Sequence, residues 1–215
     1  MVQDEKYEEG IKVFKQAIAI KADDSSIYSR LGYAYLNSGH EVEAIETFKQ
    51  GVRINSRDSA FYRALGYIYL TRANGEYAAN DAYNYLQLKG WRDDLSQYMV
   101  LVWYFALRQT KNDAFAAKKL QESIAKVDPT DWPYPVLQYL NQTLSLSEML
   151  AQAKDNDKLT EAHAYAGLEL SLNGKRTEAL DHLRWVKEKG NKNFDEYSLA
   201  LAEIDRLENA SASKP

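Results

Sequence analysis

One stretch of this chain returns almost unchanged further along, and this self-similarity constrains the fold more than any other feature. Residues 31–36 read LGYAYL, and residues 65–70 read LGYIYL. The two stretches lie 34 residues apart, and Tyr28 returns as Tyr62 at the same distance. A sequence that repeats with a period of about 20–50 residues is typical of proteins that stack one small unit several times. The chain is therefore expected to form an elongated array of similar units.

Each unit also places large and small residues at fixed positions. In the clearest unit Tyr28 precedes Leu31 and Gly32, and the small Ala44 lies four residues before Phe48. This pattern resembles the tetratricopeptide repeat, in which two antiparallel helices approach closely at small residues while large ones fill the space between units. The resemblance implies an all-α, right-handed α-solenoid of tetratricopeptide-type helix pairs. It also implies a non-enzymatic scaffold or adaptor that binds a protein or peptide in its concave groove.

The pattern predicts a single helical-repeat domain over residues 1–207. Its expected parts are a partial repeat (1–24), two repeats (25–58 and 59–90), a degenerate repeat (96–128), an irregular helical insert (131–158), a repeat (160–192) and a C-terminal capping helix (193–207). Residues 208–215 are small and polar and are expected to be disordered. In the third unit, Gly75 lies two residues later than the turn glycine of the second, which predicts a short insertion there.

The first residues match the second helix of a repeat. Tyr7, Gly10, Phe14 and Ala17 occupy the corresponding positions, which predicts that a first helix precedes Met1 in the native protein. The expected location depends on that point. The chain is cytoplasmic if it carries no signal, and periplasmic or lipid-anchored if the native N-terminus is missing.

A narrower resemblance covers roughly residues 60–207. The stretches that carry it are Trp132, 136–140 (VLQYL), 144–150 (LSLSEML), 161–167 (EAHAYAG) and 193–197 (NFDEY). They are similar to the C-terminal half of the bacterial lipoprotein family known as new lipoprotein I. That family is implied to be a helical-repeat adaptor in the bacterial envelope, often dimeric, that docks a tail-specific protease and peptidoglycan hydrolases. A homodimer and partners of that kind are the corresponding expectations here.

Composition and motifs argue against several other functions. The 215 residues include no Cys and only three His, and the formal charge of -4 is spread along the chain without a basic stripe. No two His have the spacing that builds a metal pair on one helix, and no phosphate-binding loop occurs. The longest apolar run, residues 98–107, is shorter than the about 20 residues of a membrane span. We expect no catalytic, cofactor-binding or metal site, no nucleic-acid partner and no membrane span.

The binding groove is predicted from helical phase. Most of the 16 Tyr occupy repeat positions that pack between helices, but Tyr33 and Tyr67 lie off that stripe, toward the inner groove. Arg63, four residues before Tyr67, shares its face. Because aromatic and Arg side chains concentrate binding energy, we predict a partner-binding surface along this line. Its residues are Tyr33, Arg63, Tyr67, Tyr98, Phe105 and Arg108.

Three alternatives to a partner groove remain open at this point. The same side chains can pack tightly between helices. The groove can be filled by a second copy or by the chain's own terminal helix. The chain can also be the regulatory or self-assembly appendage of a longer bacterial enzyme.

Overall fold

The computed structural model describes residues 2–212, and over that range every regular element is a helix. The all-α prediction is therefore confirmed. The helices are α1 (Val2–Ile20), α2 (Ser25–Asn37), α3 (Glu41–Ile54), α4 (Ser59–Thr71), α5 (Gly75–Lys89), α6 (Ser96–Gln109), α7 (Asp113–Ile124), α8 (Tyr134–Leu140), α9 (Leu146–Gln152), α10 (Asn156–Leu172), α11 (Arg176–Lys189) and α12 (Asp195–Ala212). None of these helices is long and apolar enough to cross a lipid bilayer.

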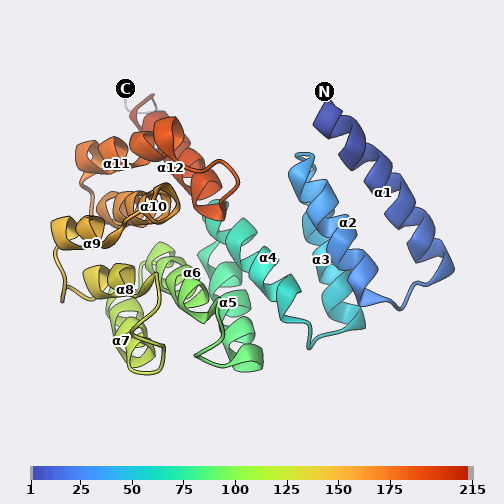
Figure 1. Cartoon of the computed structure of the whole chain (residues 1–215), viewed down its shortest axis with the longest axis horizontal. Coiled ribbons are helices and arrows are strands. Elements are labelled where there is room, and N and C mark those ends of the chain that lie inside the picture. Colours follow the sequence, from blue (N-terminus) through green and yellow to red (C-terminus); the bar gives the residue numbers. More distant parts are fainter. Residues whose placement is uncertain (1, 213–215) are drawn as a thin grey trace.

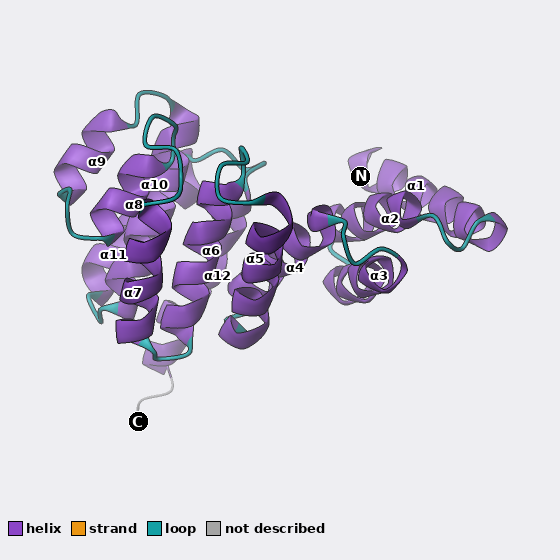
Figure 2. Ribbon diagram, turned by 90° about the horizontal axis from the view of Figure 1, so that it is seen from below, coloured by secondary structure: helices purple, strands orange, loops and turns teal. Residues whose placement is uncertain are grey.

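The helices pack mainly on their neighbours in sequence, as expected for a solenoid. The pairs α2–α3, α4–α5 and α10–α11 are antiparallel hairpins, and α1 covers one side of α2. Figure 2 shows α1, α2 and α3 as an arm that joins the other helices through α4. The last helix, α12, departs from the simple order because it returns to contact α4 (Figure 1). The predicted solenoid of helix pairs is present, and its last helix returns to α4 near the middle of the array.

Local sequence explains where the repeat helices begin. The side chain of Asp24 accepts a hydrogen bond from the backbone N–H of Ser26 and caps α2, and Asp58 caps α4 through Ala60 in the same way. The predicted capping box before α9 is also formed, between Ser145 and Glu148. Each cap satisfies an N–H group that the first turn of a helix leaves without a partner.

Four hairpins turn through a residue with positive φ, placed two positions before the second helix begins. These residues are Gly39 (81°), Ala73 (55°), Lys111 (61°) and Gly174 (74°). Helix α3 begins at Glu41 and α5 at Gly75, which is the same offset that separates Tyr28 from Tyr62. The insertion predicted in the third unit is therefore wrong. The turn keeps its position because Ala73 adopts the left-handed conformation that a glycine supplies in the preceding unit.

We expect Lys111→Gly to raise the free energy of unfolding by about 0.5–1 kcal/mol, because a non-glycine residue is disfavoured at this φ. Lys111 is exposed, so the substitution removes little packing. The matched change Gly39→Ala should have the opposite sign, since its added Cβ meets only open space and acts through the backbone alone. Urea denaturation measures both, and a loss of stability in Lys111→Gly would contradict this account.

Glycines allow two fully buried rings to fill the crossings of the first repeats. A Cβ atom on Gly32 would lie 2.4 Å from the ring of Phe48, and one on Gly51 would lie 2.3 Å from the ring of Phe61. Both rings are completely buried. The prediction that Gly32 is a position of close helix approach is confirmed, and Gly51 is a second such position.

The first helix packs through an apolar face, whereas the last helix extends further than the sequence predicts. In α1, Ile11 is buried, and Phe14 and Ile18 pack against the core, as the sequence predicts. At the other end, α12 does not stop near Leu207 but continues to Ala212. The expectation of a disordered tail is thus wrong for residues 208–212, while residues 213–215 lie outside the described range.

Candidate functional site

The concave side of the solenoid is divided into a part that the chain fills itself and a part that stays open. Helices α10 and α12 lie against α6 and α4, so they cover the inner face of the third and fourth units. The inner face of α2 and the part of α4 from Arg63 to Thr71 line an unfilled cavity instead. The six predicted groove residues are distributed over both parts.

Tyr67 lies at the border between the two parts, because it also lines the unfilled cavity. Its side chain is only 7% exposed, and its hydroxyl donates to Oε1 of Glu196 in α12 over 3.3 Å. The same oxygen accepts a bond of 2.5 Å from the hydroxyl of Tyr165 in α10. Tyr67 therefore faces the inner side as predicted, but its hydroxyl contacts the chain's own terminal helix there and not a partner.

Phe105 is also enclosed by the chain itself. It is 1% exposed, and its ring stacks on that of Tyr165, with the centroids 5.7 Å apart and the planes 9° apart. A partner protein cannot reach Phe105 while α10 is in place. The prediction of its orientation is right, and the prediction that a partner contacts it is wrong for this arrangement of the helices.

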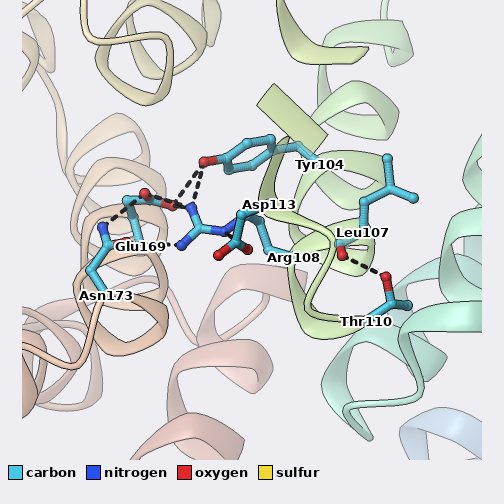
Figure 3. Close-up of polar contacts among 7 residues, drawn as sticks. All are labelled: Tyr104, Leu107, Arg108, Thr110, Asp113, Glu169 and Asn173. Atoms are coloured by element: carbon cyan, nitrogen blue, oxygen red, sulfur yellow. Dashed lines mark hydrogen bonds and ion pairs between the residues drawn. The ribbon is translucent and has the colours of Figure 1, made fainter. Parts of the chain in front are cut away.

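Arg108 forms the centre of a polar network between α6 and α10 (Figure 3). The side chain is 8% exposed, and Nη1 lies 2.8 and 2.9 Å from the two carboxylate oxygens of Glu169. Further bonds join it to the hydroxyl of Tyr104, the amide oxygen of Asn173 and the carboxylate of Asp113. Every part of the guanidinium fork thus has a partner within the chain, so Arg108 holds the two halves of the solenoid together.

Tyr33 and Arg63 lie at the open part. Nη2 of Arg63 donates to the Tyr33 hydroxyl over 2.9 Å, and Nη1 lies 3.2 Å from Oδ2 of Asp195. The guanidinium carbon also lies 5.9 Å from the centroid of the Tyr33 ring. Both side chains remain partly exposed. They form the wall of a cavity of about 530 Å³, here named the open groove, which is lined by residues that include Tyr33, Leu36, Asn37, Arg63, Asn193 and Ser198.

A second cavity of about 280 Å³ adjoins the open groove, and the two share Arg63 and Asp195 in their walls. The sixth predicted residue, Tyr98, lines it and donates to Oε1 of Glu161 over 3.2 Å. Trp132 Nε1 donates to the other oxygen of Glu161. Burial and the nearby Glu196 raise the pKa of Glu161 to about 8. The wall of this cavity therefore contains a carboxyl group that is protonated at neutral pH.

The structure also joins residues that the sequence does not connect. His163 in α10 and His182 in α11 are both partly buried, and their Nδ1 atoms lie 2.8 Å apart. His163 lies in the middle of α10, and neither His is fully exposed. The turn between α10 and α11 lies between the two residues, so helical spacing does not relate them. No motif of the sequence could have indicated the pair.

One family of repeat proteins combines antiparallel helix pairs with a common turn and the 34-residue offset that separates α3 from α5. Residues 2–39 match the family model of the TPR repeat. The match covers α1 and α2, which form one wall of the arm that borders the open groove. No curated protein matches the chain. TPR repeats generally mediate contacts between proteins, which supports a role in protein binding.

Proposed function

We propose that this protein is a non-catalytic TPR scaffold that binds an extended segment of a partner protein in the open groove. The observation that carries the proposal is the pair Tyr33 and Arg63, which stands partly exposed at the wall of a large cavity. Aromatic and Arg side chains at the centre of an interface supply most of its binding energy. The pair is held in place by Asp195, so little side-chain freedom is lost on binding.

The lining of the groove favours an extended backbone over an apolar helix. Amide groups of Asn37 and Asn193 and the hydroxyl of Ser198 lie among charged groups of both signs, Arg63 and Asp195. Such groups pair with the N–H and C=O groups that an extended peptide exposes, whereas an apolar helix face would leave them without partners. The expected ligand is therefore a polar, extended segment.

The test begins with a peptide selected against the purified protein from a random displayed library. We expect the double variant Tyr33→Ala, Arg63→Ala to weaken binding of that peptide by about 2 kcal/mol or more, measured by calorimetry. The matched control is Tyr83→Ala, Arg53→Ala, which removes an exposed Tyr and an exposed Arg from α5 and α3.

Two results would count against the proposal. One is an unchanged affinity in the groove variant while its circular dichroism spectrum stays helical. The other is an equal loss of affinity in the control variant, which would place the peptide elsewhere on the surface.

The resemblance to new lipoprotein I supports a narrower form of the proposal, in which the partner is a protease or a cell-wall hydrolase of the bacterial envelope and the chain is dimeric. The second candidate is a regulatory or self-assembly repeat appendage of a longer bacterial enzyme. The coding sequence upstream distinguishes the two. A lipoprotein signal supports the adaptor, and a catalytic domain supports the appendage.

A further inference from the structure

Two histidine side chains from different helices meet at the contact between α10 and α11. The Nδ1 atoms of His163 and His182 lie 2.8 Å apart, with the ring centroids separated by 4.9 Å. Trp185 stacks on His163 at a centroid distance of 4.2 Å and an interplanar angle of 10°. Trp185 itself packs against a buried apolar cluster. This stacking fixes one imidazole, and both rings keep a partly exposed edge.

The two Nδ1 atoms point toward each other, and this geometry suits a shared electrophile. In the hydrogen-bonded pair one Nδ1 carries a proton and the other accepts it. When both rings carry their proton on Nε2 instead, two lone pairs converge on the space between them. A tetrahedral metal ion at about 2.0–2.1 Å from each nitrogen requires a separation of roughly 3.3 Å. The separation must therefore open by about 0.5 Å, and each ring must turn by about 35° so that its lone pair meets the ion at a tetrahedral angle.

Burial lowers the pKa of both His163 and His182 and so favours neutral imidazole, which is the ligand form of histidine.

We propose that His163 and His182 together bind one divalent transition-metal ion of the Zn²⁺ or Cu²⁺ class. Imidazole nitrogen suits these ions, whereas Mg²⁺ and Ca²⁺ prefer oxygen. Within the described residues no cluster of three or more His, Asp or Glu surrounds a common point. Water or a donor atom of another molecule therefore completes the coordination, and binding is reversible. The fold does not depend on the ion, because α10 and α11 already pack through Gly167 and Leu183.

Calorimetric titration with zinc sulfate, copper sulfate and magnesium chloride tests the site. We expect one Zn²⁺ or Cu²⁺ per chain, no binding of Mg²⁺, and a dissociation constant raised about tenfold or more in His182→Asn. The matched control is His40→Asn, which removes the third His, in the turn before α3. It should bind both metals as the parent does. A melting curve confirms that each variant is folded.

Absence of binding for both Zn²⁺ and Cu²⁺ would overturn the proposal. So would an affinity that is unchanged in His182→Asn or lost in His40→Asn, because the ion would then be held elsewhere.

Discussion

Replacing Arg108 with methionine is expected to lower the free energy of unfolding by about 3–5 kcal/mol, the typical cost of breaking a buried ion pair by removing one partner. The substitution leaves Glu169, whose side chain is only 13% exposed, without its counter-ion, while Tyr104 and Asn173 still donate hydrogen bonds to it. Methionine has a similar length and fills most of the space. The loss therefore reflects the unpaired charge rather than a cavity, and denaturant unfolding measures it.

Two variants separate these causes. Adding Glu169→Gln to Arg108→Met removes the uncompensated charge and should recover a large part of the loss. The control Arg63→Met breaks the ion pair with Asp195, whose side chain is 45% exposed, and should cost about 1 kcal/mol or less. If Arg108→Met lowered the free energy of unfolding by less than about 1 kcal/mol, the network would not hold α6 against α10.

The second large effect is a dependence of stability on pH to which the buried carboxyl of Glu161 contributes. Burial first, and then the neighbouring Glu196, raise the pKa of Glu161 from 4.5 to about 8 in the folded chain. Between these values the folded state binds more protons than the unfolded state. The free energy of unfolding must therefore fall as the pH rises through this window, by up to about 1.4 kcal/mol per pH unit for one proton.

Glu161→Gln should remove this contribution and make the protein more stable than the parent at pH 8. Glutamine keeps an oxygen for Tyr98 and Trp132 but cannot ionise. The measurement is the free energy of unfolding between pH 6.5 and 8. Below that range the histidine pair acts with the opposite sign, because the depressed pKa of His163 makes protonation favour the unfolded state.

The control for this prediction is Glu122→Gln in α7. Lys119 lowers the pKa of the exposed Glu122, so this carboxyl is ionised throughout the window and its removal should leave the slope unchanged. Asp81, with a pKa raised by burial to about 7, contributes a second proton with the same sign as Glu161. It leaves a residual slope in Glu161→Gln. Identical slopes for Glu161→Gln and the parent would contradict the account.

The sequence predicts those parts of the fold that depend on local pattern. The repeat period, the caps at Asp24 and Asp58 and the close approach at Gly32 all follow from residues near one another in the chain. The position of a turn is harder to predict from the sequence. Ala73 occupies a left-handed turn position without being a glycine, so the sequence suggested an insertion that does not exist.

The sequence predicts only part of the candidate site. Helical phase gives the direction in which a side chain points, but it does not show which other helix packs against that side chain. Phe105 and Arg108 face inward as their phase indicates. Their partners, Tyr165 and Glu169, lie in α10, far along the chain from α6. The return of α12 onto α4 depends on such distant contacts, as does the meeting of His163 with His182, and no periodicity encodes them.

The central claim is that the open groove between α2, α4 and the start of α12 is the surface that binds a partner. Mapping amide chemical shifts of the isotope-labelled protein with the library-selected peptide tests it most directly. The account predicts that the largest changes fall on α2, on α4 and on residues 192–198. Changes confined to the outer faces of α5 and α7, with none at the groove, would contradict it.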